Sequence, residues 1–140
     1  MSKGTYVLRI KVKKDLLLNV GALGKRRFEK GVYLYVGSAM NSLEKRVKRH
    51  IKKEKKKRWH IDYLTTAEGV EIEGAYVFRE KRIEEKLSEA LSGICKSVDG
   101  FGASDMKNVK SNLYLSNEDA KKVIQDWGGS KFDEIFSGDA

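Results

Sequence analysis

Apolar and polar residues alternate over residues 5–12, and this pattern limits how the beginning of the chain can fold. The apolar members share one side of an extended segment: Tyr6, Leu8, Ile10 and Val12. A period of two residues is typical of a β-strand with one buried face. Leu16–Val20 and Gly31–Val36 predict two more strands, separated by a basic, glycine-containing loop over Gly21–Lys30. We therefore expect a small central antiparallel sheet flanked by helices, with about three core strands and an extension by further strands left open.

Helical spacing replaces alternation in the middle of the chain. Asn41 or Ser42 can cap a helix, and the apolar residues that follow recur every four positions: Leu43, Val47 and Ile51. Arg46 and His50 lie beside this stripe, one helical turn apart. Both side chains are therefore expected at the edge of the core, where a pocket would form.

The rest of the chain predicts further short elements. Trp59–Leu64 alternates and predicts an extended segment, with His60 and Asp62 on one face. The remaining predictions are a strand at Val70–Phe78, a helix at Arg82–Cys95, a strand at Asn112–Leu115 and a helix capped by Asn117 that ends at Trp127. The 140 residues thus predict one α+β domain, with a core over about 4–115 and a C-terminal helical extension over 116–140.

The positive charge of the chain is concentrated in one segment. Residues 45–58 hold ten Lys and Arg against Glu54, which accounts for the net charge of +9, because the remaining nineteen basic and nineteen acidic residues cancel. Such a field attracts phosphate backbones, although a solvated helix face, another polyanion or an anionic membrane surface would fit the same charge. The predicted nucleic-acid-binding residues are Lys45, Lys48, Arg49, Lys52, Lys53, Lys55, Lys56, Lys57 and Arg58.

Composition excludes several other classes. The apolar runs are too short to span a bilayer, and the N-terminus lacks the layout of a signal peptide. Cys95 is the only cysteine, so no internal disulfide can form, and we expect a cytoplasmic protein with no membrane partner. One cysteine and two histidines are too few for a structural zinc site, and no motif predicts an organic cofactor.

Phosphodiester hydrolysis needs a group that activates water, a cation, and positive charge near the phosphate. Tyr6 and Tyr35 lie on adjacent predicted strands, Arg46 can clamp a phosphate bidentately, and His50 can relay a proton. Glu84 lies at the border of the apolar stripe in the first turn of its helix, where it can hold Mg²⁺. On helix geometry alone, an ordinary first-turn glutamate is the favoured interpretation.

Five short motifs follow one another in this chain: G-T-Y-V-L, Y-V-G-S-A, R-x-x-R-H, W-H-I-D-Y-L and G-F-G-x-S-D. With the helix-borne Glu84, they resemble the GIY-YIG nuclease superfamily, and more closely an archaeal and bacterial branch labelled as a domain of unknown function. The resemblance covers Gly4 to Leu115 and implies a three-stranded antiparallel sheet flanked by helices. Gly4 and Tyr35 are farther apart than is usual in the superfamily.

The resemblance implies a role for each candidate. One of Tyr6 and Tyr35 would act as general base and the other would position the water, while Arg46 would steady the transition-state phosphate. His50 would occupy the position one turn later, and Glu84 would ligate one Mg²⁺, with Mn²⁺ as an alternative. The accessory candidates are Gly37, Ser38, His60, Asp62, Ser104 and Asp105. Structural roles remain open for the last four: a pair bracing the sheet and a structured turn.

The G-F-G-x-S-D motif of this chain differs from that of the branch it resembles. Its usual cysteines and histidine are replaced by Ala103, Met106, Asn108 and Asn112, and the asparagine that completes some superfamily sites has no assigned counterpart. We expect a metal-dependent endonuclease of DNA rather than RNA, in repair or processing, as a monomer or weak homodimer. The alternatives are a non-catalytic nucleic-acid-binding module and a fold-only interaction domain.

Overall fold

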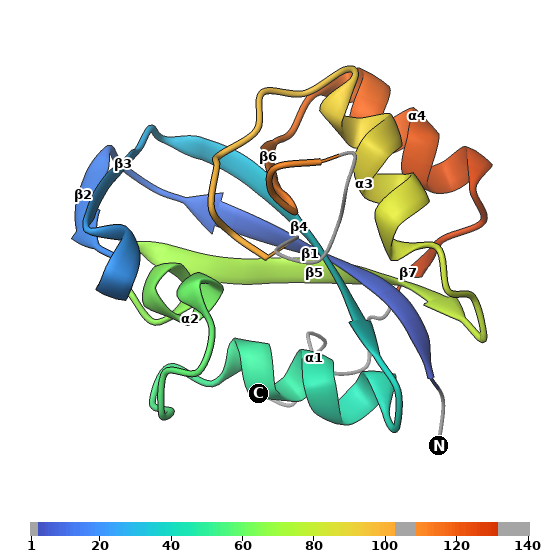
Figure 1. The fold of residues 1–140 in the computed structure, drawn as a ribbon, viewed down its shortest axis with the longest axis horizontal. Coiled ribbons are helices and arrows are strands. Elements are labelled where there is room, and N and C mark those ends of the chain that lie inside the picture. The colour runs from blue at the N-terminus through green and yellow to red at the C-terminus, as the bar shows by residue number, and fades with distance from the viewer. Residues whose placement is uncertain (1–2, 103–108, 132–140) are drawn as a thin grey trace.

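The computed structural model describes residues 3–102 and 109–131 (Figure 1). Its centre is a five-stranded antiparallel sheet with the strand order β6-β4-β1-β5-β7. The strands are β1 (Gly4–Val12), β4 (Gly31–Ala39), β5 (Val70–Arg79), β6 (Leu113–Leu115) and β7 (Ser130–Lys131). The α+β class is confirmed, but the sheet is larger than the predicted three core strands, because two short strands extend its edges.

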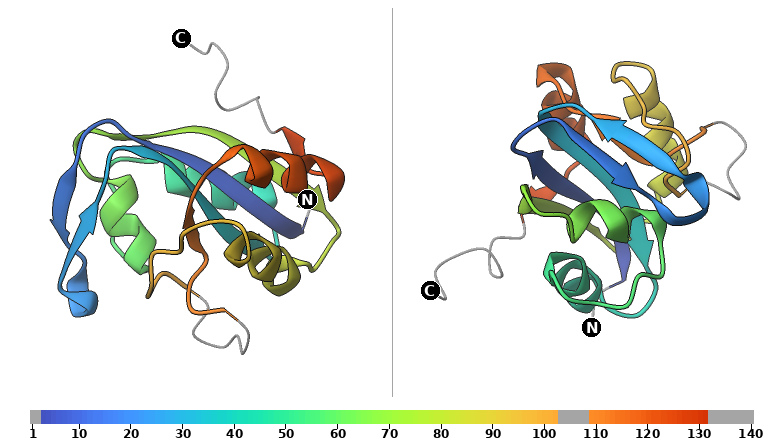
Figure 2. Two further views of the ribbon diagram at one scale, coloured as in Figure 1. Left: turned by 90° about the horizontal axis from the view of Figure 1, so that it is seen from above. Right: turned by 90° about the vertical axis from the view of Figure 1, so that its left-hand side faces the viewer.

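Helices cover both faces of the sheet (Figures 1 and 2). On one face, α1 (Leu43–Ile51) and α2 (His60–Thr65) pack on a core that includes Tyr6, Leu8 and Ile10. On the other, α3 (Glu84–Ser92) and α4 (Glu118–Asp126) pack on a second core that includes Val7 and Val36. The alternation along β1 therefore sends successive side chains into two different cores.

The prediction of a loop over Gly21–Lys30 is wrong, because these residues contain a strand. β2 (Leu16–Asn19) pairs with β3 (Lys25–Phe28) in a separate two-stranded sheet, with a short 3₁₀ turn, η1 (Gly21–Leu23), between them. Phe28 is the only fully buried residue of β3, so that strand lacks the apolar alternation that sequence patterns detect. The partners of β1 in the central sheet are β4 and β5, so β2 lies outside that sheet.

The extended segment predicted at Trp59–Leu64 is also wrong, because these residues begin α2. The carboxylate of Asp62 accepts hydrogen bonds from the backbone N–H groups of Arg58 and Trp59, which caps the first turn. Ile61 and Leu64 are both buried, and their spacing of three residues is that of a helix face.

The other elements follow the prediction closely. Ser42 caps α1, because its Oγ accepts a hydrogen bond from the Lys45 backbone N–H at 3.2 Å. Asn117 caps α4 in the same way through the Ala120 backbone N–H at 2.9 Å. α3 is shorter than the predicted helix and ends at Ser92. No helix of the described ranges is both long and apolar enough to cross a bilayer.

Candidate active site

A buried hydrogen bond joins β1 to α1. The Tyr6 hydroxyl lies 2.8 Å from His50 Nε2, and both side chains are almost inaccessible to solvent. Strand register pairs Tyr6 with Gly37 of β4. A Cβ at residue 37 would lie 2.4 Å from both Cζ and Oη of Tyr6, so the tyrosine ring occupies the space that a side chain would need. Gly37 is therefore required for the position of the Tyr6 hydroxyl.

Burial keeps this pair uncharged. Burial, with the nearby Lys55 ammonium, lowers the pKa of His50 to about 3, so the imidazole is neutral at pH 7. Burial and the neighbouring Tyr35 raise the pKa of the Tyr6 hydroxyl, while Arg46 lowers it. The result is a neutral phenol against a neutral imidazole. His50 Nδ1 has no hydrogen-bond partner among the described residues.

Aromatic rings surround His50 on its remaining sides. The Tyr35 ring is edge-on at a centroid distance of 6.0 Å, and the Trp59 ring is tilted at 5.8 Å. Burial raises the pKa of Tyr35, and the Glu84 carboxylate raises it further. A Cβ at Gly102 would lie 3.5 Å from the Tyr35 hydroxyl, which places that hydroxyl beside the Gly102 backbone.

Arg46 lies one turn before His50 on α1 and is held by two contacts. Its Nη1 donates to the Ser38 carbonyl oxygen at 2.9 Å, and its Cζ lies 4.9 Å from the centre of the Trp59 ring. Ser38 therefore contributes its backbone to this site. Arg46 also lines a pocket of 260 Å³ whose other charged members are Lys45 and Arg49. Three cations that line one pocket favour the binding of an anion in it.

Glu84 joins this group from the first turn of α3. Its Oε2 accepts a hydrogen bond from Nδ2 of Asn112 at 3.1 Å, and its charge raises the pKa of both Tyr6 and Tyr35. Asn112 was not among the predicted site residues. It is buried, and its Oδ1 accepts from the Ser88 hydroxyl at 2.8 Å, so it bridges α3 and the strand that follows it.

Glu84 also lines a pocket of 330 Å³ that contains Gly4, Ser38 and Arg82. No group of three His, Cys, Asp or Glu side chains gathers anywhere in the described ranges. Mg²⁺ keeps several waters and often takes only one or two carboxylates, together with substrate phosphates. A half-buried carboxylate at the N-terminus of a helix, oriented by an amide, is compatible with such a site.

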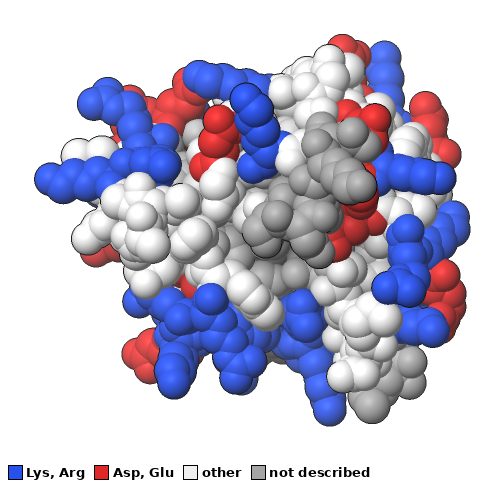
Figure 3. All heavy atoms as spheres, viewed as in Figure 1, with Lys and Arg blue, Asp and Glu red and all other residues white. Residues whose placement is uncertain are grey.

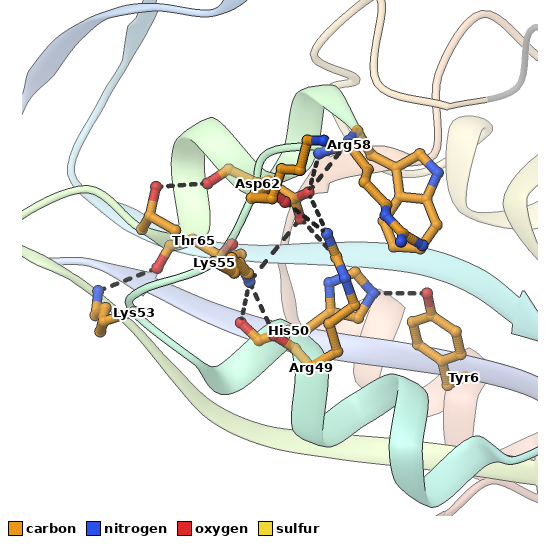
Figure 4. A network of polar contacts seen from close by, with 11 residues as sticks. Tyr6, Arg49, His50, Lys53, Lys55, Arg58, Asp62 and Thr65 are labelled. Carbon is orange, nitrogen blue, oxygen red and sulfur yellow. Dashed lines mark hydrogen bonds and ion pairs between the residues drawn. The ribbon is translucent and has the colours of Figure 1, made fainter.

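His60 and Asp62 do not form the predicted pair. His60 lies at the start of α2, and its Nδ1 is 3.1 Å from the Gly100 carbonyl oxygen. Asp62 is fully buried and accepts two hydrogen bonds from the Arg49 guanidinium, at 3.1 and 2.9 Å (Figure 4). They therefore have different partners, and neither contacts the other. Ser104 and Asp105 lie outside the described residues.

The basic segment separates into two groups. Arg49 pairs with Asp62, the Lys55 ammonium contacts the carbonyl oxygens of Arg49 and His50, and Lys53 donates to backbone carbonyls that include Thr65 (Figure 4). These three cations hold the segment after α1 against α2, and the Arg49 side chain is only partly exposed. Apart from Lys53, which is exposed but donates to backbone carbonyls, the exposed cations of residues 45–58 are Lys45, Lys48, Lys52, Lys56, Lys57 and Arg58. Figure 3 shows Lys and Arg gathered along the lower edge, where α1 lies in Figure 1.

The aromatic residue Trp59 was also missing from the predicted site. Guanidinium carbons of Arg46 and Arg49 lie 4.9 and 4.4 Å from its ring centre. Asp62 orients Arg49, and Arg49 and Arg46 share the Trp59 ring, so α2 helps to position the candidate phosphate clamp on α1. The motif W-H-I-D-Y-L was the available signal for this role.

Comparison with known proteins adds one finding. A search of curated proteins and a search of solved structures each returned no match. A family model matches residues 5–130, which is most of the chain and spans β1 to β7. The match includes all of the side chains that form the cluster around His50. The chain belongs to the family described as domain of unknown function DUF123.

Proposed function

We propose that this protein is a metal-dependent endonuclease that hydrolyses nucleic-acid phosphodiesters, with DNA as the preferred substrate. The observation that carries the proposal is the Tyr6–His50 hydrogen bond of 2.8 Å, which lies one helical turn from Arg46. Packing alone does not require a phenol, an imidazole and a guanidinium to converge. Burying polar groups is costly, so a fold tends to keep them only where they are paired or used.

The proton path follows from this bond. Tyr6 gives its hydroxyl proton to Nε2 of His50 and accepts a proton from the attacking water, whose oxygen bonds to phosphorus. The P–O3′ bond breaks, the leaving oxygen takes a proton from solvent, and the products carry 5′-phosphate and 3′-hydroxyl ends. Burial and Lys55 lower the pKa of His50 most, and Arg49 and Arg46 lower it further, so a bound phosphate that offsets the arginine charges makes the imidazole a better acceptor.

Arg46 and Glu84 supply the charges that the phosphate needs. The planar guanidinium of Arg46 donates two parallel hydrogen bonds to a phosphate more readily than an ammonium does. Glu84 would hold one Mg²⁺ or Mn²⁺, which when bound supplies electrostatic stabilisation of the developing charge. Asn112 holds one oxygen of Glu84 in place, as outer partners of metal ligands commonly do.

The exposed cations provide the approach surface. Besides Lys53, six exposed Lys and Arg side chains of residues 45–58 belong to α1 and the segment after it. Contacts from such cations to phosphates are independent of sequence and sensitive to salt. This surface equally supports the second candidate, a nucleic-acid-binding module without catalysis. The observation that favours this alternative is the low pKa of His50.

The two candidates are separated by a cleavage assay. Purified protein is incubated with branched, nicked and single-stranded DNA and with RNA, in Mg²⁺, Mn²⁺ or EDTA, beside Arg46→Ala and Glu84→Ala. The proposal predicts cleavage that needs metal and is abolished by either change. Binding that survives both changes, with no cleavage of any substrate by the wild type, favours the module instead.

A further inference from the structure

A third pocket lies beside the candidate cutting site and has no part in the mechanism above. Its volume is 250 Å³. Six residues line it: Tyr35, Arg58, Trp59, His60, Gly100 and Gly102. Two of the sequence motifs, W-H-I-D-Y-L and G-F-G, meet here from opposite sides, although forty residues separate His60 from Gly100. In the proposed hydrolysis, Trp59 and Asp62 only position Arg46 and Arg49, and neither His60 nor the G-F-G motif has a role.

The lining has the character of a site for a flat, aromatic ligand. Its lining includes three aromatic residues, Trp59, His60 and Tyr35, and Arg58 contributes an exposed cation. The opposite wall is formed at two glycines with φ angles of +95° and +75°, Gly100 and Gly102, so it presents backbone rather than side chains. Aromatic surfaces beside polar backbone are the usual surroundings of a bound nucleobase.

His60 is held in a defined state at this pocket. Its Nδ1 lies 3.1 Å from the Gly100 carbonyl oxygen, which can only accept a hydrogen bond. Nδ1 is therefore the donor in this contact, which leaves Nε2 to face a ligand. The ring is further fixed by an edge-to-face contact with Phe101, at a centroid distance of 6.5 Å. A base with an amino or imino N–H can donate to Nε2 of this ring.

Tyr35 links the pocket to the cutting site. Its ring contacts His50 at a centroid distance of 6.0 Å, and its hydroxyl lies beside Gly102. Trp59 forms a second link, because the Arg46 guanidinium lies over its ring. Tyr35 and Trp59 therefore connect the pocket to the site that contains His50 and Arg46. The occupant that fits this relationship is the base of the nucleotide that flanks the scissile bond.

We propose that this pocket binds a single unpaired nucleobase, turned out of its stack, next to the phosphate that is cut. The inference rests on the proposed function for its position relative to the cut, and it specifies the substrate class. A base in a regular duplex cannot enter a pocket while it remains paired. The preferred substrate is therefore a single strand, bulge or mismatch with an unpaired nucleotide at the cleavage position.

Tryptophan fluorescence tests the pocket without any cleavage. The chain has two tryptophans, and Trp127→Phe leaves Trp59 as the only one. This variant, kept in EDTA, is titrated with a short single strand of DNA and with an abasic sugar–phosphate strand of equal length and charge. We expect the base-containing strand to quench Trp59 and to bind about 5- to 100-fold more tightly, which is the contribution of stacking one base.

His60→Ala is the test variant, and Arg58→Ala is its matched control. His60→Ala should remove the preference for the base-containing strand and leave the affinity for the abasic strand unchanged. Arg58→Ala should lower the affinity for both strands by the same factor, because it removes only a charge. If His60→Ala is poorly folded by circular dichroism, His60→Phe replaces it; this variant keeps a ring but lacks the Nε2 acceptor, so it should reduce the preference for the base-containing strand.

Two results overturn the proposal: equal affinity for both strands in the wild type, or base-strand binding that leaves Trp59 fluorescence unchanged. The outcome is independent of catalysis. If the protein prefers the base-containing strand but cleaves no substrate, the endonuclease proposal is refuted and the base-pocket proposal is supported. Cleavage without any base preference supports the endonuclease and refutes the base pocket. Failure to bind either strand contradicts both proposals.

Discussion

The Asp62 carboxylate holds the Arg49 guanidinium through two hydrogen bonds, of 3.1 and 2.9 Å, at the junction of α1 and α2. Asp62 is fully buried and also accepts from two backbone N–H groups at the start of α2. Although burial raises the pKa of Asp62, the hydrogen bonds from Arg49 and from the backbone lower it to about 2. One carboxylate thus fixes both the segment between two helices and a cation of the basic surface.

Asp62→Ala should destabilise the fold by about 3–5 kcal/mol, because it leaves the Arg49 charge and buried N–H groups without their partner. Urea denaturation measures the change. The matched control is Lys121→Ala, which removes an exposed pair on α4 and should change the free energy of unfolding by less than about 0.5 kcal/mol. A loss for Asp62→Ala as small as that of the control would contradict the structural role of the buried carboxylate.

The stability of the protein should fall as pH is lowered from 6.5 toward 3. The pKa of His50 is about 3 in the folded protein against an ordinary value of 6.5, so in this window the unfolded chain binds a proton that the folded chain does not. The unfolded state gains on the order of 1 kcal/mol per pH unit from this proton. Asp62 adds to the loss below about pH 5, where its carboxylate begins to be protonated in the unfolded chain.

The His50 contribution is isolated by His50→Gln, compared with the wild type in urea at pH 7 and pH 4.5. The variant should lose less stability between the two pH values than the wild type. His60→Gln, which keeps His50, should retain the wild-type dependence. Parallel curves for the wild type and His50→Gln would show that the imidazole is not held neutral by burial.

Gly37→Ala should displace the Tyr6 ring, because the new Cβ would lie 2.4 Å from two of its atoms. Overpacking of this kind costs about 1–3 kcal/mol, and the proposed cleavage should fall with it. Gly74→Ala is the control, since Gly74 lies in β5 and a Cβ added there would meet no other atom within 4 Å. The control should retain stability and cleavage. Equal behaviour of the two variants would mean that Tyr6 does not depend on the space at Gly37.

Substitutions in the two groups of basic residues should affect different properties, namely nucleic-acid binding for one group and stability for the other. Lys52→Gln with Lys56→Gln removes exposed cations and should flatten the dependence of log binding constant on log salt by about 0.9 for each lost phosphate contact. Lys53→Gln with Lys55→Gln removes cations that bind backbone carbonyls, and it should lower the stability instead. Circular dichroism melts and binding titrations distinguish the effects. An unchanged salt slope in the first double variant would exclude both lysines from the phosphate contact.

The sequence predicted the central strands and α1 because their residues follow regular spacing. Tyr6 and Tyr35 alternate with apolar neighbours on adjacent strands, and the position of Arg46 and His50 beside the Leu43 stripe follows from helical geometry alone. These four side chains do converge. Asn112 could not be assigned, because its contact with Glu84 spans 28 residues and depends on how β6 meets α3.

Two errors have a shared physical cause. Over Trp59–Leu64, apolar residues at alternate positions fit a strand, but capping by Asp62 and burial of Ile61 with Leu64 favour a helix. In β3, cations occupy most positions, so a pattern based on apolar residues does not detect the strand. Tertiary contacts determine the secondary structure of both segments, and a short stretch of sequence does not contain the residues that make those contacts.

The rate at which Tyr6→Phe cleaves a substrate with an unpaired nucleotide, in single-turnover conditions with Mg²⁺, tests the central claim most directly. The change removes one hydroxyl that lies 2.8 Å from His50 and leaves the buried ring. We predict a rate at least about 100-fold below that of the wild type. Tyr33→Phe, which removes a hydroxyl bonded to the Glu29 carbonyl oxygen, should stay within a few-fold. Cleavage by Tyr6→Phe at the wild-type rate would contradict the account.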